Sequence, residues 1–151
     1  MIIAVTQFNQ KRNQLSWVLD TELLMLREEI REFWDAITLA ERVDAFIDTR
    51  YVWIGTKIKA SYNTINLPKE LHANIEMSLT LMSDYLMEEL GDKYYEIIAN
   101  AEKIVCQANE LKGTKLDDNG KVIKDKAYTE AIDATKRIAL MIEEVTKPTS
   151  F

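Results

Sequence analysis

The chain has 151 residues, of which 47% are hydrophobic and 29% charged, and its formal net charge is −6. Four glycines and two prolines are too few for the frequent tight turns of a many-stranded sandwich or barrel, so long helices are favoured. A single cysteine and a single histidine exclude an intramolecular disulfide and a Cys/His zinc site within one chain. The negative charge argues against a protein that coats nucleic acid polymers, but it is compatible with binding one nucleotide through a metal.

No segment has the features of a signal peptide or a membrane span. The apolar start, residues 1–5, is too short for a signal-peptide core and lacks a basic leader. No apolar run approaches the roughly 18 residues that a membrane-spanning helix needs. We therefore expect residues 1–151 to form a single domain of a soluble, cytoplasmic protein with no membrane partner.

Hydrophobic periodicity predicts one short helix near the N-terminus, followed by five longer helices. The first long helix begins at an N-cap of Asp20 or Thr21 and reaches Ile37. Thr38 is the expected N-cap of the second long helix, and Gly91 is expected to end the third. The predicted ranges of the short helix and of the second to fifth long helices are 5–12, 39–60, 69–90, 92–111 and 129–145.

The segment before the last helix, residues 112–128, has a different character. It contains Asp118-Asn119-Gly120-Lys121, which is typical of a tight turn because Asn-Gly tolerates positive φ. A short ordered loop or hairpin is expected there. The sequence therefore predicts an all-α bundle of four to five helices, interrupted by this loop.

Three acidic residues share one face of the second long helix. At about 100° per residue, Glu41, Asp44 and Asp48 fall within an arc of about 60°. Apolar residues border them, and the neighbouring residues Arg42 and Arg50 point to the other side of the helix. Three like charges at this spacing repel one another, so a divalent cation is the economical way to offset them.

The first long helix supplies a second acidic set. Glu29 lies at the edge of its apolar stripe, and Glu28 stacks on Glu32 one turn further along. Taken alone, this stretch also suits a solvated helix face, since arginines interleave with the acids. In an antiparallel hairpin, however, both acidic sets can meet, and four to five oxygen ligands without His or Cys suit Mg²⁺ or Mn²⁺. The candidate metal ligands are Glu29, Glu32, Glu41, Asp44 and Asp48.

This acidic pattern resembles the all-α nucleoside triphosphate pyrophosphohydrolases, the MazG-like superfamily that includes the dimeric dUTPases. The family signature is E-E-x-x-E on one helix and E-x-x-D on the next, and the corresponding residues here are 28–32 and 41–44. Many members have an aspartate followed three residues later by tyrosine, a pattern that Asp48 and Tyr51 fit. The aspartate of the second motif therefore stays open between Asp44 and Asp48.

A second resemblance lies further along the chain. Residues 109–112 and 118–124 look like the S-N-x-x-K and D-G-K-V-x-K segments of phage-type members. The resemblance implies that the amide and ammonium groups of these segments bind the triphosphate, which suits their chemistry. The substrate-binding candidates are Asn109, Lys112, Lys121 and Lys124.

The resemblance implies Mg²⁺-dependent hydrolysis of an NTP or dNTP to the monophosphate and pyrophosphate, in nucleotide-pool house-cleaning or phage nucleotide metabolism. It also implies a homodimer or homotetramer. A carboxylate outside the tightest metal shell would accept the proton of the attacking water, and Glu28 and Glu32 are the candidates. The alternatives are a non-catalytic helical dimer that acts as an adaptor or regulator through its acidic face, and a metal-storage or sensing bundle.

Overall fold

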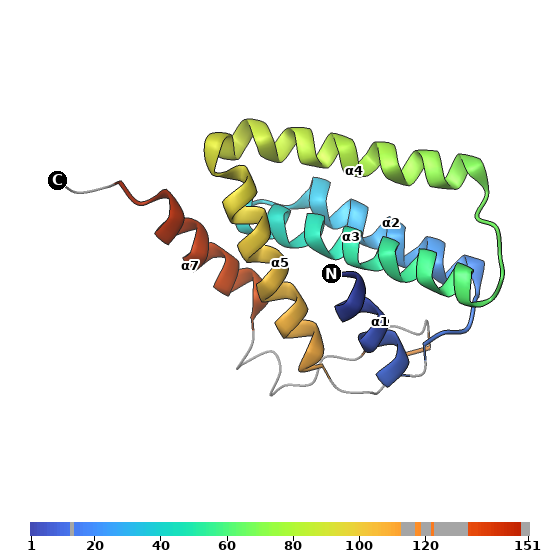
Figure 1. Ribbon diagram of the computed structural model, residues 1–151. Helices are drawn as coiled ribbons and strands as arrows, with labels where there is room; N and C mark the ends of the chain where they lie inside the picture. The colour runs from blue at the N-terminus through green and yellow to red at the C-terminus, as the bar shows by residue number, and fades with distance from the viewer. Residues whose placement is uncertain (13, 113–116, 119–121, 123–132, 149–151) are drawn as a thin grey trace.

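The computed structural model describes residues 1–12, 14–112, 117–118, 122 and 133–148 (Figure 1). Within these ranges the secondary-structure elements are six α-helices and one short 3₁₀ helix. Five of the α-helices exceed ten residues, which confirms the predicted all-α bundle. The elements are α1 (Ile2–Lys11), α2 (Leu19–Asp35), α3 (Leu39–Tyr62), α4 (Lys69–Leu90), η1 (Gly91–Lys93), α5 (Tyr94–Glu110) and α7 (Ala134–Thr146).

Helix α3 is the centre of the fold. It packs against α1, α2, α4, α5 and α7. Helix α2 lies antiparallel beside it, across the short connection at residues 36–38, and α4 runs along the other side of this hairpin (Figure 1). The hairpin brings the facing sides of α2 and α3 together, so side chains from both helices can line one cavity.

The start of α3 is fixed by a capping box, and Thr38 is its N-cap, as the sequence predicted. The Thr38 hydroxyl accepts a hydrogen bond from the Glu41 backbone N–H at 3.2 Å. In return, Glu41 Oε2 accepts from the backbone N–H of Thr38 at 3.2 Å and of Ile37 at 2.9 Å. These contacts satisfy N–H groups that have no partner within the helix, and they set the tight turn out of α2.

The predicted N-cap of α2 is wrong by two to three residues. Val18 is the N-cap, with an extended backbone, and it makes no side-chain capping hydrogen bond. Asp20 and Thr21 therefore lie inside the first turn of the helix. The charge of Asp20 still favours this end of the helix, because the exposed N–H groups there carry partial positive charge.

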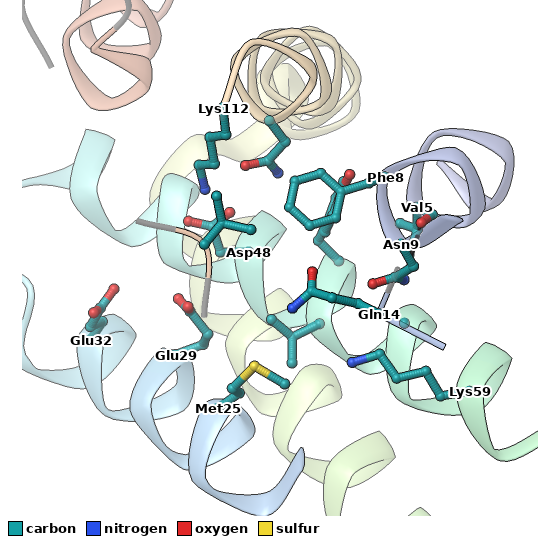
Figure 2. A pocket seen from close by; sticks show the side chains of 15 residues that line it. Val5, Phe8, Asn9, Gln14, Met25, Glu29, Glu32, Asp48, Lys59 and Lys112 are labelled. Carbon is teal, nitrogen blue, oxygen red and sulfur yellow. Dashed lines mark hydrogen bonds between the residues drawn. The ribbon is translucent and has the colours of Figure 1, made fainter. Parts of the chain in front are cut away.

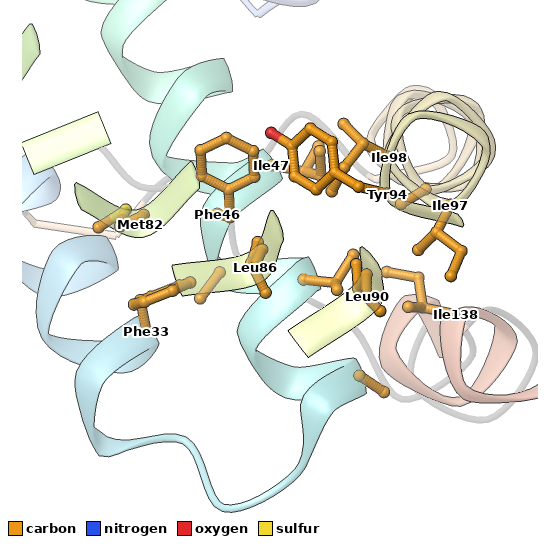
Figure 3. Close-up of a cluster of buried hydrophobic side chains, with 14 of the residues drawn as sticks. Phe33, Phe46, Ile47, Met82, Leu86, Leu90, Tyr94, Ile97, Ile98 and Ile138 are labelled. Atoms are coloured by element: carbon orange, nitrogen blue, oxygen red, sulfur yellow. The ribbon is translucent and has the colours of Figure 1, made fainter. Parts of the chain in front are cut away.

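A hydrophobic core joins α2, α3, α4, α5 and α7 (Figure 3). On α4, apolar residues recur every fourth position and present one stripe to the centre of the bundle. Each fully buried Leu, Ile, Phe or Met side chain contributes about 1.5–3 kcal/mol to the free energy of unfolding, relative to the same side chain in solvent. The prominent members are Phe33, Phe46, Ile47, Met82, Leu86, Leu90, Tyr94, Ile97, Ile98 and Ile138.

The corner between α4 and α5 depends on Gly91. Its φ of +57° lies in the region that residues with a Cβ avoid, so glycine turns the chain here without strain. The observed α4 matches the predicted range 69–90, and α5 begins after the short η1.

Two expectations about the C-terminal third fall partly outside the described residues. Most of the predicted loop or hairpin at 112–128 does so, as does the predicted start of the last helix at residue 129. The described start of α7 is capped by Asp133, whose Oδ1 accepts from the Lys136 backbone N–H at 3.1 Å. Among the helices that the structure describes, none is long and apolar enough to cross a membrane.

Candidate functional site

A pocket lies between α1, α2, α3 and the C-terminal end of α5 (Figure 2). It encloses about 140 Å³ and is partly open to solvent. Apolar side chains from α1, α2 and α3 form much of its wall, and the remaining lining residues carry polar or charged groups. These are Asn9, Gln14, Glu29, Glu32, Asp48, Tyr51, Lys59, Asn109 and Lys112.

Three of the predicted metal ligands line this pocket. Glu29 and Glu32 come from neighbouring turns of α2, and Asp48 faces them from α3 (Figure 2). Glu29 is buried, Asp48 is half-buried and Glu32 is exposed to solvent. The spacing of three residues places Glu29 and Glu32 on one side of α2, because residues three apart are neighbours on a helix surface.

These carboxylates offer only oxygen ligands, which is the ligand type that Mg²⁺ and Mn²⁺ prefer. Within the described ranges, no group of three or more His, Cys, Asp or Glu side chains stands close enough together to hold a metal ion. The three pocket carboxylates thus match a hard divalent cation by ligand type, although as they stand in this structure they are not close enough together to coordinate one ion jointly.

The structure does not bring the other predicted acids into the pocket. Glu41 uses its carboxylate in the capping box of α3, at the end of the helix. Asp44 Oδ2 accepts a hydrogen bond from the Thr135 hydroxyl at 2.6 Å, which ties α3 to α7. Glu28 is exposed and does not line the pocket. Of the two aspartates left open by the motif, Asp48 is the one in the pocket.

Two of the predicted substrate-binding residues line the same pocket. Asn109 is buried near the C-terminal end of α5, and the side chain of Lys112 extends from just beyond that helix toward Asp48 (Figure 2). The predicted Lys121 and Lys124 lie outside the described residues. Val122, which is described, is buried and contributes to the pocket wall.

Arg12 holds the C-terminal end of α5 in place beside the pocket. Its guanidinium lies 3.8 Å from the centre of the Phe8 ring. Through Nη2 it donates to the backbone carbonyl of Asn109 at 3.1 Å and to that of Lys112. Burial lowers the pKa of this guanidinium, yet arginine remains charged at neutral pH. A cation at a helix C-terminus is favourable, because the last carbonyls carry partial negative charge.

Lys59, at another part of the pocket wall, belongs to a buried ion pair. Lys59 Nζ lies 2.7 Å from Glu22 Oε1, and the Thr56 hydroxyl donates to Glu22 Oε2 at 2.7 Å. Sequence reasoning missed this group, although a signal was present. Lys59 lies eleven residues after Asp48 on α3, so the two share one face within about 20°.

Tyr51 packs between the acidic part of the pocket and α1. Its ring meets that of Phe8 edge to face, with centroids 5.7 Å apart. Burial is the main cause that raises the pKa of the Tyr51 hydroxyl above its ordinary value, and the nearby Cys106 and Asp48 raise it further. Tyr51 is therefore a neutral group in the pocket over the whole physiological pH range.

Comparison of the chain with protein-family models, curated proteins and solved structures finds no match.

Proposed function

We propose that this protein is a Mg²⁺-dependent nucleoside triphosphate pyrophosphohydrolase, which converts an NTP or dNTP to the monophosphate and pyrophosphate. One observation carries the proposal. Three carboxylates predicted as metal ligands share a pocket with two residues predicted to bind the triphosphate, although these residues come from three separate parts of the chain. The resemblance of their motifs to the MazG-like superfamily supplies the reaction.

In this proposal the acidic and the basic or amide residues of the pocket have different roles. Glu29 and Asp48 would hold Mg²⁺ most closely and Glu32 at the edge of its ligand shell, and the ion when bound would neutralise charge on phosphate oxygens and lower the pKa of bound water. Lys112 donates hydrogen bonds to phosphate oxygens, and the Asn109 amide orients them.

Glu32 is the better placed of the two candidate general bases. It lines the pocket, whereas Glu28 does not. It is also exposed, so it can pass a proton on to solvent. In the proposed reaction Glu32 accepts the proton of the attacking water, and the bond between the α- and β-phosphates breaks as pyrophosphate leaves.

The size of the pocket limits how a nucleotide binds. The enclosed space of about 140 Å³ is smaller than the roughly 300–1,000 Å³ of pockets that enclose a drug-sized ligand. A nucleotide would therefore lie partly in the open mouth of the pocket.

An oligomer, a homodimer or homotetramer, belongs to the same proposal. Large apolar side chains on α2 and α4 are exposed, and exposed apolar surface is often covered by a partner. They include Leu24, Trp34, Met77 and Leu81. Light scattering of the purified protein measures the oligomeric state, and a monomer at micromolar concentration would contradict this part of the proposal.

The decisive experiment incubates the purified protein with each common NTP and dNTP plus Mg²⁺ and follows monophosphate and pyrophosphate. We expect turnover of at least one nucleotide and its loss in EDTA. Glu29→Gln should abolish this turnover, whereas the control Glu28→Gln, one residue away and outside the pocket, should not. No turnover with any nucleotide, or turnover that survives EDTA, would overturn the proposal and favour the non-catalytic adaptor.

A further inference from the structure

The pocket has two chemically different ends (Figure 2). Glu29, Glu32 and Asp48 lie at one end, and Lys59 lies at the other. Both Asp48 and Lys59 belong to the same face of α3. Eleven residues of helix separate them, which is about 16 Å at 1.5 Å per residue. An elongated ligand with different groups at its two ends suits this arrangement.

The Lys59 ammonium is buried and paired with Glu22, and it has further N–H donors. Its side chain is 8% exposed, and Nζ is fixed at 2.7 Å from Glu22 Oε1. An ammonium group carries three N–H donors. Among the described residues, Glu22 is the acceptor for one of these donors, so two remain to be satisfied at the pocket wall.

The net charge of the Lys59–Glu22 pair indicates which kind of ligand group it binds. Glu22 neutralises Lys59, so the pair presents hydrogen-bond donors without a net positive charge. A phosphate would meet the Glu22 carboxylate as well as the ammonium, and the desolvation cost would not be recovered. A neutral carbonyl oxygen can accept from the ammonium without adding a charge.

We propose that Lys59 is a specificity-determining residue that donates a hydrogen bond to a carbonyl oxygen of the nucleobase. This inference rests on the proposed function, since it assumes that the phosphates occupy the acidic end. Adenine has no carbonyl oxygen, whereas uracil, thymine, cytosine and guanine each have at least one. Adenine accepts hydrogen bonds only at its ring nitrogens, which lie at different positions from a carbonyl oxygen, so a lysine placed to meet a carbonyl disfavours adenine nucleotides.

Binding of nucleoside monophosphates tests the inference without requiring hydrolysis. Isothermal titration calorimetry with UMP, CMP, GMP and AMP should give, for at least one carbonyl-bearing nucleotide, a Kd about 10-fold lower than that of AMP. The variant Lys59→Met combined with Glu22→Gln removes the ammonium without leaving an unpaired buried carboxylate. It should reduce this preference to within about 2-fold. The control Lys57→Met changes an exposed lysine on the same helix, outside the pocket, and should keep the preference.

Equal affinity of the wild-type protein for AMP and for the other three nucleotides would overturn the inference, whether or not the double variant folds. A folded double variant that retains the preference, checked by circular dichroism, would also overturn it. Failure of the proposed function looks different: the base preference would be present and sensitive to Lys59, but no triphosphate would be hydrolysed. Hydrolysis without any base preference would leave the proposed function standing and remove the role of Lys59.

Discussion

Arg12 Nη2 donates a hydrogen bond of 3.1 Å to the backbone carbonyl of Asn109, which lies 97 residues further along the chain. The contact joins the end of α1 to the end of α5, and both helices supply residues to the pocket. Since the same guanidinium also bonds the carbonyl of Lys112, one side chain fixes the position of two proposed substrate-binding residues.

Replacing Arg12 by methionine should therefore affect both stability and binding. Arg12→Met keeps most of the apolar stem but removes the charged hydrogen bonds, so the free energy of unfolding should fall by about 2–3 kcal/mol. In the proposed reaction KM should rise more than kcat falls, because Lys112 loses its anchor. Urea denaturation and steady-state kinetics measure the two effects. The control Lys11→Met, at an exposed neighbour, should change stability by less than about 0.5 kcal/mol. Equal free energies of unfolding and equal KM values for Arg12→Met and Lys11→Met would show that the Arg12 hydrogen bonds to α5 contribute neither to stability nor to binding.

Mutation of Asp44 and of Asp48, the two aspartates of α3, should have clearly different effects on kcat. Asp48→Asn removes a carboxylate from the pocket and should lower kcat at least about 100-fold. Asp44→Asn keeps an oxygen that can accept from Thr135, so it should retain most of kcat and lose less than about 1 kcal/mol of stability. The measurement is kcat at saturating Mg²⁺ for both variants. An inactive Asp44→Asn beside an active Asp48→Asn would reverse the assignment.

Glu41 should behave as a capping residue. Glu41→Ala breaks the capping box and should lower the free energy of unfolding by about 1 kcal/mol, with no change in the Mg²⁺ concentration required for half-maximal rate. Glu32→Ala should raise the Mg²⁺ concentration required for half-maximal rate and leave the free energy of unfolding nearly unchanged, since Glu32 lines the pocket and caps no helix. Thermal unfolding and Mg²⁺ titrations of both variants test this contrast. A changed Mg²⁺ requirement in Glu41→Ala would restore Glu41 as a metal ligand.

Tyr51 should make the protein less stable at high pH. The pKa of its hydroxyl is raised in the folded state above an ordinary value of 10.0, chiefly by burial. Its stabilising effect is therefore complete below pH 10 and declines as the pH rises toward the folded-state pKa. The decline is at most about 1.4 kcal/mol per pH unit.

The variant Tyr51→Phe isolates this effect. No described residue hydrogen-bonds to the buried Tyr51 hydroxyl, so the substitution should cost little at pH 7. Above pH 10 the free energy of unfolding should fall more steeply for the wild type than for the variant, as measured by urea titration at several pH values. Parallel curves for the two proteins would mean that Tyr51 does not titrate differently in the folded state.

Much of the fold could be predicted because its signals are local. Thr38 and Glu41 stand at capping-box spacing, and the predicted start of α3 is confirmed. Gly91 ends α4 where the chain needs a positive φ. At the start of α2 the prediction failed, because Val18 makes no capping contact that a residue preference would reveal.

The candidate site could be predicted only in part, for a different reason. The spacing of Glu29 and Glu32, and the position of Asp48, place them on helix faces that line one pocket in the structure. Helical periodicity alone does not show where along α3 the pocket lies, so it groups Glu41 with Asp48 although Glu41 lies in the first turn of the helix. The contact of Arg12 with α5 connects distant segments, and no local pattern indicates it.

The shortness of α1 has a consequence for the dynamics of the site. A helix of ten residues is marginal in water on its own, so its order depends on packing against α3 and α5. It also supplies Val5, Phe8 and Asn9 to the pocket. Local unfolding of α1 would therefore remove these three residues from the pocket wall. A ligand that bridges α1 and α3 shifts this equilibrium toward the helix, and amide hydrogen exchange in α1 then reports how much of the site is occupied.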